Sequence, residues 1–142
     1  MLIFLPSLAI FDIEYDQLIN LILLFFLFYS FTSFNYIIND LIDLTQDKKN
    51  FLKKERLIAK NLISKHQILI YLILLLLLNI FITVLSEQKI LFVKITIIYL
   101  IFANIYSFIL KKIIIINIFY LNFFYIYRIY AGSIISEIDI SV

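Results

Sequence analysis

Three aspartates follow one another at spacings of +3 and +4, at Asp40, Asp43 and Asp47. On a continuing helix these spacings place the three carboxylates on one face, a turn apart. Carboxylate oxygens suit hard divalent cations, and Mg²⁺ typically bridges one or two carboxylates to the phosphates of a substrate. This aspartate row predicts a Mg²⁺ site in which all three residues are metal ligands and catalytic residues. The alternative is an exposed, charged helix end that Lys48 and Lys49 balance.

A basic segment follows the aspartate row directly. Residues 48–65 carry seven of the 12 Lys and Arg residues of the chain. Lys53, Lys54, Arg56 and Lys60 have the right groups to hold phosphate oxygens, Arg through paired N–H donors and Lys as a point charge. The positive-inside rule explains the same enrichment without a binding site, because the cytoplasmic loops of membrane proteins are rich in Lys and Arg. Residues 40–66 are therefore a candidate substrate loop on the cytoplasmic side.

The composition of the whole chain excludes a soluble protein. Hydrophobic residues make up 64% of the 142 residues and charged residues 15%, against about 45–50% and about 25% in soluble domains. A globule of this size has too little interior to bury that much apolar surface. The absence of Cys excludes disulfides and thiolate metal sites, and a single His excludes a His-cluster zinc site within the chain. A net charge of +2 is too small for a general nucleic-acid-binding protein.

Four apolar segments have the length of about 20 residues that a membrane-spanning helix needs. Their apolar residues are continuous rather than alternating, which favours helices over a transmembrane barrel. An earlier apolar run, Leu2–Phe11, is interrupted by Pro6 and covers only part of a bilayer. The sequence thus predicts an all-α polytopic membrane helix bundle, a single domain over residues 1–142, with a short N-terminal partial helix and four full spans: Gln17–Asn39, Gln67–Leu85, Ile90–Leu110 and Ile113–Ile135.

The charges of the connections predict the orientation of these spans. The basic loop is cytoplasmic by the positive-inside rule, and the connection at Lys111–Lys112 then falls on the same side. The acidic connections at residues 86–89 and 137–139 fall outside. We therefore expect a multi-pass protein of the cell inner membrane.

The residues around the aspartate row resemble a known family. The pattern Asn39-Asp40-x-x-Asp43-x-x-x-Asp47 is similar to N-D-x-x-D-x-x-x-D, the first aspartate-rich motif of the UbiA-type intramembrane polyprenyl transferases. In its context, Tyr36–Asp43, it looks most like the branch of the decaprenyl-phosphate phosphoribosyltransferases. Two weaker similarities agree with this branch, and they occur along the chain in the same order as in the family. The first is a Tyr-Ser pair followed by a Lys within Asn104–Lys111, and the second is the pattern R-x-x-A-G at Arg128–Gly132.

The resemblance implies a Mg²⁺-dependent enzyme that acts on a polyprenyl lipid substrate and a pyrophosphorylated donor. In the branch named above, the donor is phosphoribosyl pyrophosphate and the acceptor a polyprenyl phosphate. The resemblance also implies a set of substrate-binding residues. Tyr106 has an alternative interpretation as an interfacial aromatic residue, and Lys111 as a cation that stabilises a helix C-terminus. The implied substrate-binding residues are Asn39, Lys54, Arg56, Tyr106 and Lys111.

The chain also differs from the family pattern. The family loop usually reads R-P-x-A-S-G where this chain reads Arg56–Asn61, R-L-I-A-K-N. The family fold has about nine helices, so the chain corresponds to roughly its N-terminal half, with a separate C-terminal half as a candidate partner. Two alternatives remain open, an aromatic prenyltransferase of the quinone or heme type within the same family and a non-catalytic truncated membrane fragment.

Overall fold

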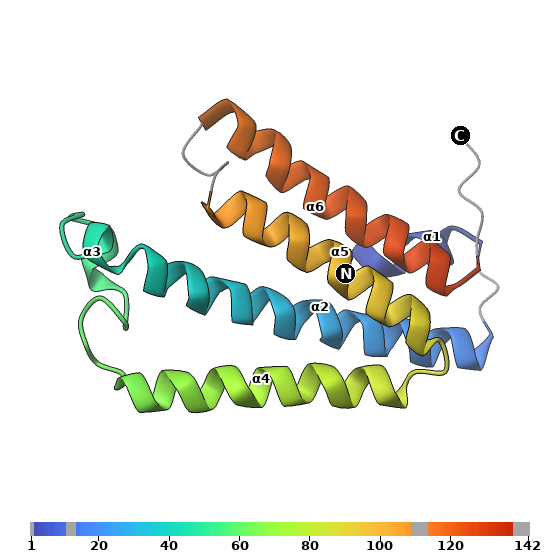
Figure 1. The fold of residues 1–142 in the computed structure, drawn as a ribbon. Coiled ribbons are helices and arrows are strands. Elements are labelled where there is room, and N and C mark those ends of the chain that lie inside the picture. The colour runs from blue at the N-terminus through green and yellow to red at the C-terminus, as the bar shows by residue number, and fades with distance from the viewer. Residues whose placement is uncertain (1, 11–13, 109–113, 138–142) are drawn as a thin grey trace. The chain divides into compact units, whose positions relative to one another are not determined.

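The computed structural model describes residues 2–10, 14–108 and 114–137 of the chain. The elements in these residues are all helical, and Figure 1 labels the α-helices along the chain. The four long helices are apolar and long enough to cross a membrane, which confirms the prediction of an all-α membrane protein with four full spans. In chain order the elements are η1 (Leu2–Phe4), α1 (Leu5–Ile10), α2 (Tyr15–Ile42), α3 (Leu44–Asp47), η2 (Lys53–Glu55), α4 (Lys65–Leu85), α5 (Lys89–Phe108) and α6 (Ile114–Ile135).

The predicted helix bounds agree with the observed ones to within three residues wherever both can be compared. The helix α2 begins at Tyr15 rather than Gln17 and ends at Ile42 rather than Asn39. The predicted end of the third span, Leu110, and the predicted start of the fourth, Ile113, lie outside the described residues. The short N-terminal partial helix is confirmed by η1 and α1, where Pro6 occupies the first turn of α1 and its missing N–H breaks no helical hydrogen bond.

The described residues fall into two compact units. The first unit comprises residues 1–27 and 82–142, and the second comprises Phe28–Phe81. The division passes through α2 and α4, each of which contributes to both units. The expectation of a single membrane domain stays a prediction.

The first unit is held together by close packing of its N-terminal segment on α6. Gly132 is the only glycine of the chain, and a Cβ at this position would lie 2.1 Å from the backbone oxygen of Ile3. Glycine therefore allows η1 to approach the backbone of α6. Hydrogen bonds between other segments also stabilise this unit. The hydroxyl of Ser86 donates to Asn20 Oδ1 at 3.2 Å, and the hydroxyl of Tyr127 donates to the carbonyl of Ile95 at 2.8 Å.

In the second unit, α2 and α4 run side by side, and residues 43–64 connect them at one end (Figure 1). A buried hydrogen bond joins the two helices, from the hydroxyl of Ser30 to Asn79 Oδ1 at 2.5 Å. The side chains of Ser64 and Gln67 fix the start of α4, because each accepts a hydrogen bond from the backbone N–H of the other. This reciprocal pair is a capping box, which satisfies two N–H groups that a helix N-terminus leaves open.

Candidate functional site

The aspartate row lies at the junction of α2 and α3, at one end of the second unit. The helix is interrupted at Asp43, but the N–H of Asp43 donates to the carbonyl of Asn39 at 2.9 Å and the N–H of Asp47 donates to the carbonyl of Asp43 at 2.8 Å. These bonds keep the helical spacing across the interruption. The predicted continuing helix is therefore observed with one break, after Ile42.

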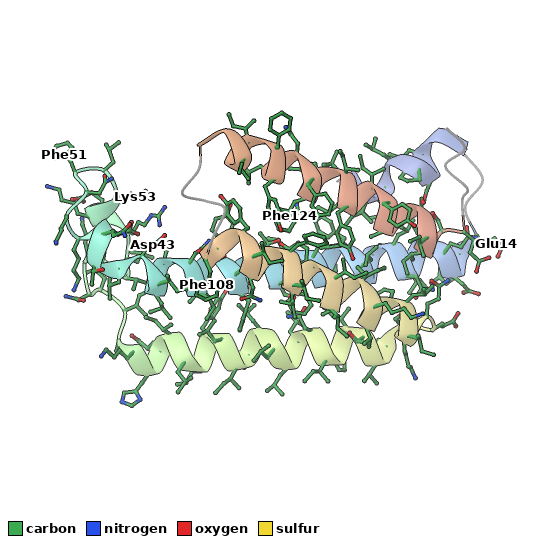
Figure 2. All side chains as sticks on the ribbon, turned by 45° about the horizontal axis from the view of Figure 1, so that its top comes forward. Glu14, Asp43, Phe51, Lys53, Phe108 and Phe124 are labelled. Atoms are coloured by element: carbon green, nitrogen blue, oxygen red, sulfur yellow. The ribbon has the colours of Figure 1, made fainter. Side chains whose placement is uncertain are left out.

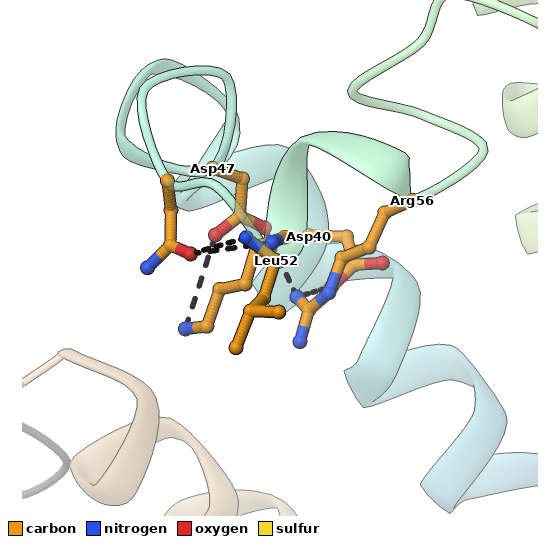
Figure 3. A network of polar contacts seen from close by, with 6 residues as sticks. Asp40, Asp47, Leu52 and Arg56 are labelled. Atoms are coloured by element: carbon orange, nitrogen blue, oxygen red, sulfur yellow. Dashed lines mark hydrogen bonds and ion pairs between the residues drawn. The ribbon is translucent and has the colours of Figure 1, made fainter.

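Two members of the aspartate row meet at a single cation (Figure 3). The NH1 nitrogen of Arg56 donates to Asp40 Oδ1 at 2.5 Å and to Asp47 Oδ2 at 3.0 Å. The Lys53 ammonium lies 3.9 Å from the other oxygen of Asp47. The side chain of Asp47 is only 3% exposed, and that of Asp40 is 26% exposed. A buried carboxylate and a partly exposed one thus converge on one guanidinium nitrogen.

The third carboxylate belongs to the same electrostatic group. Asp40 interacts electrostatically with the positive charges of Arg56 and Lys53 and with the negative charges of Asp43 and Asp47. Three negative and two positive formal charges leave the group with one net negative charge.

The donor set can be compared with what Mg²⁺ requires. Within the ranges that the structure describes, no group of three or more His, Cys, Asp or Glu side chains is arranged to hold a metal ion by itself. Mg²⁺ usually keeps several waters and uses one or two carboxylates together with substrate phosphates. Asp40 Oδ1 and Asp47 Oδ2 already point to one atom, so the residues fit an ion held by these two carboxylates and by phosphate oxygens.

The loop that supplies Arg56 closes in a tight turn. Asn61 has a φ of 55°, its N–H donates to the carbonyl of Ile58, and the N–H of Leu62 donates to the carbonyl of Leu57. This pair of bonds is the one that ends a helix in a Schellman motif, where the left-handed position is usually Gly and sometimes Asn. Asn61 stands at the position of the Gly in the family pattern, and it adopts the left-handed conformation that Gly adopts most easily.

We expect this turn to tolerate Asn61→Gly and to be weakened by Asn61→Val. A β-branched residue in the left-handed region costs about 1–2 kcal/mol, whereas Gly adopts it freely. Limited trypsin digestion at the basic residues 48–65 reports the change, with faster cleavage in Asn61→Val and little change in Asn61→Gly. Equal cleavage of the two variants contradicts the role of the turn.

The remaining predicted residues lie in different places. The Lys54 ammonium lies over the ring of Phe51, 4.6 Å from its centroid, and not at the carboxylates. Tyr106 belongs to the first unit, where its ring stacks on that of Tyr120 with a centroid distance of 5.6 Å. Figure 2 shows this aromatic group around Phe124, between α5 and α6. Lys111 lies outside the described residues.

Asn39 is half-buried one position before Asp40, and its carbonyl accepts the hydrogen bond from Asp43. The structure therefore brings together Asp40, Asp47 and Arg56 from the predicted set, with Asn39 and Asp43 beside them in the chain. Lys53, one of the basic residues that the sequence indicates for phosphate, lies with its ammonium 3.9 Å from Asp47 Oδ1.

A pocket of about 720 Å³ opens beside the Asp40–Arg56 pair, within the second unit. Its other walls are mainly apolar and come from α2, from the turn after Arg56 and from the first turns of α4. Sequence reasoning missed the contribution of α4. The S-x-x-Q capping signal at Ser64–Gln67 could have located the start of this helix and its first inward-facing residues. The lining residues are Ile37, Asp40, Arg56, Leu57, Ile58, Leu62, Ile63, Gln67, Ile68 and Tyr71.

The comparison with protein families decides the classification. A profile of the UbiA prenyltransferase family matches residues 1–142. The chain belongs to the UbiA prenyltransferase family. No curated protein and no solved structure matches it. Membership confirms the family that the motif Asn39–Asp47 predicted, and it identifies the chain as a membrane protein of a transferase family, for which a lipid substrate fits the four apolar spans.

Proposed function

We propose that the chain transfers the phosphoribosyl group from phosphoribosyl pyrophosphate to a polyprenyl phosphate. The reaction requires Mg²⁺ and takes place at the cytoplasmic face of the inner membrane. The observation that carries the proposal is the convergence of Asp40 Oδ1 and Asp47 Oδ2 on one cation. Family membership supports prenyl transfer. The phosphoribosyl branch is supported by the resemblance of Tyr36–Asp43 and Arg128–Gly132 alone, and the cytoplasmic location by the basic charge of loop 40–66.

In this proposal, each member of the site has a defined role. Asp40 and Asp47, with Asp43 beside them, would hold Mg²⁺, and the ion would supply Lewis-acid stabilisation of the negative charge that develops on the leaving group. Arg56 and Lys54 donate hydrogen bonds to other phosphate oxygens. The amide of Asn39 helps to orient the donor. Further contacts to the substrate, assigned on the family resemblance alone, come from Tyr106 and Lys111.

The reaction is a displacement at the anomeric carbon of the donor. An oxygen of the polyprenyl phosphate attacks ribose C1, a new C–O bond forms, and the bond from C1 to the pyrophosphate breaks. The electron pair of that bond leaves with the pyrophosphate, whose charge is balanced by the site. The contribution of the chain is to place the two substrates together. Both are negatively charged and repel each other unless cations are bound between them.

The pocket beside the site suits the lipid. Its volume of about 720 Å³ is within the range of small-molecule sites, about 300–1,000 Å³. Apolar side chains from α2, from α4 and from the turn after Arg56 form most of its wall, and the charged groups of Asp40 and Arg56 also line it. This arrangement accepts the first isoprene units of the polyprenyl phosphate while the phosphate faces the ionic group.

We expect Ile37→Trp to fill this pocket and to raise the KM for the polyprenyl phosphate about tenfold, because apolar pockets discriminate by volume. The KM for phosphoribosyl pyrophosphate should change little. Tyr36→Trp is the matched control, since Tyr36 is 68% exposed on the same helix and does not line the pocket. Steady-state kinetics in detergent micelles measures both constants. Equal effects of the two variants contradict the assignment.

The proposed function is tested by following ribose-labelled phosphoribosyl pyrophosphate in washed membranes that contain the chain. Label should appear in the lipid extract only when Mg²⁺ and polyprenyl phosphate are present, and it should be absent with Asp40→Asn. Label transfer from a prenyl diphosphate to an aromatic acceptor instead favours the quinone or heme type of family member. No transfer in either assay supports the non-catalytic alternative.

A further inference from the structure

Arg56 contacts both carboxylates through the same nitrogen. Because Asp40 Oδ1 and Asp47 Oδ2 are directed at NH1, a divalent ion that bridges these two oxygens needs the space that the guanidinium occupies. The two cations exclude one another. We infer that Arg56 acts as an exchangeable internal cation, which holds the carboxylates until the pyrophosphate group of the donor draws it away and a divalent ion takes its place. This inference rests on the proposed function and adds a rule for the order of binding.

Burial explains why an internal cation is needed. The side chain of Asp47 is 3% exposed, and a buried charge without a partner is strongly destabilising. The Lys53 ammonium, at 3.9 Å from Asp47 and with a side chain 48% exposed, compensates only part of this charge. Arg56 therefore keeps the pair of carboxylates together before substrate arrives, which preorganises the oxygen ligands for a metal ion.

The position of Arg56 allows it to leave. Its side chain is 41% exposed, it follows η2 in an extended backbone conformation, and it also lines the pocket. A guanidinium binds phosphate oxygens through two parallel N–H groups, and this geometry is at least as favourable as its geometry at the two carboxylates. The exchange needs only a rotation of an exposed side chain, while Asp40 and Asp47 stay in place.

The exchange links the two ligands thermodynamically. Without pyrophosphate, a divalent ion must displace Arg56 and leave the guanidinium without its two partners. With pyrophosphate, the guanidinium gains new acceptors and the metal gains phosphate ligands. Each ligand therefore strengthens the binding of the other, which is positive coupling between neighbouring sites. Removing Arg56 should abolish most of this coupling and raise the affinity for the metal alone.

The test uses Mn²⁺ alone as the probe and measures its binding to the detergent-solubilised chain by electron paramagnetic resonance, as a function of the free Mn²⁺ concentration. For the wild type, we expect inorganic pyrophosphate to strengthen Mn²⁺ binding about tenfold or more, within the usual range of coupling. Arg56→Gln should bind Mn²⁺ alone about tenfold more tightly than the wild type does, and pyrophosphate should add little. Arg56→Lys, which keeps the charge, should remain weak without pyrophosphate.

Two further measurements make the outcome decisive. Lys49→Gln is the matched control, because Lys49 is an exposed cation of the same loop and should leave Mn²⁺ binding unchanged. Thermal unfolding measurements show whether each variant is folded. If Arg56→Gln binds Mn²⁺ alone no more tightly than the wild type, the exchange is wrong and the proposed function stands. If Mn²⁺ does not bind to any variant, with or without pyrophosphate, both the exchange and the proposed function are wrong.

Discussion

Asp47→Asn is expected to lower Mg²⁺-dependent pyrophosphate release from phosphoribosyl pyrophosphate about 100-fold or more, comparable to the loss of one major group that stabilises developing charge. The variant keeps the shape of the side chain but removes a buried negative charge that faces Arg56 at 3.0 Å. It thereby removes one of the two carboxylates that converge on the cation position. Washed membranes with matched amounts of each variant allow the rates to be compared.

Glu55→Gln is the matched control for this prediction. Glu55 lies in the same loop, is exposed, and pairs with Lys60 rather than with Arg56. The hydrogen bond from Lys60 lowers the pKa of the Glu55 carboxyl below its usual value, so Glu55→Gln also removes a full negative charge near neutral pH. Its rate should stay within about twofold of the wild type, as for other surface changes. If Asp47→Asn and Glu55→Gln lower the rate of pyrophosphate release equally, the total charge of the loop determines the rate, and the proposed role of Asp47 is contradicted.

Gly132→Ala is expected to be the most damaging small substitution for the fold. In an ordinary helix position this change adds stability, by about 1 kcal/mol. Here the new Cβ would lie 2.1 Å from the backbone oxygen of Ile3 and 3.0 Å from its carbonyl carbon. Backbone atoms cannot move aside as a flexible side chain does, so the N-terminal segment must shift. We expect a net loss of about 1–3 kcal/mol, the usual cost of overpacking.

A single cysteine reports this shift, because the natural chain has none. Ile3 is 2% exposed, so Ile3→Cys should react slowly with a maleimide in the wild-type background and faster when combined with Gly132→Ala. Tyr130→Ala is the control, since Tyr130 is 56% exposed on the same helix. Unchanged maleimide reactivity in the Gly132→Ala background contradicts the close contact between η1 and α6.

The sequence predicted the transmembrane helices well because a single physical requirement defines them. A span must be apolar and about 20 residues long, and α2, α4, α5 and α6 are visible as such runs between polar connections. Helix ends are less visible in the sequence than the apolar runs are, and α2 extends to Ile42, beyond the predicted end at Asn39. The capping pair Ser64–Gln67 sets the start of α4.

The sequence predicts which residues belong to the candidate site, and it does not predict the contacts between them. The spacing of Asp40 and Asp47 placed them on one helical face, and the helical hydrogen bonds on either side of Asp43 agree. The contact of both with Arg56 could not be predicted, because it depends on how the intervening loop turns back on the end of α2. In that loop the side-chain oxygen of Asn50 accepts hydrogen bonds from the backbone N–H groups of Leu52 and Lys53.

Sequence reasoning assigned Arg56 to phosphate and the aspartates to metal, as two separate groups. The structure shows them in direct contact. Under the proposed function, the aspartates and Arg56 each have one partner within the chain and one in the substrate complex. The partner within the chain becomes visible only in the three-dimensional contacts. For the same reason, Lys54 was grouped with Arg56 by sequence, although its ammonium lies over the ring of Phe51.

The most direct measurement is a crystal structure of the chain grown with Mn²⁺ and pyrophosphate, with X-ray data collected near the manganese absorption edge. We predict an anomalous difference peak between the carboxylates of Asp40 and Asp47, with the Arg56 guanidinium turned from these oxygens to the pyrophosphate. An anomalous peak elsewhere, or pyrophosphate bound with Arg56 still paired to both aspartates, contradicts the account.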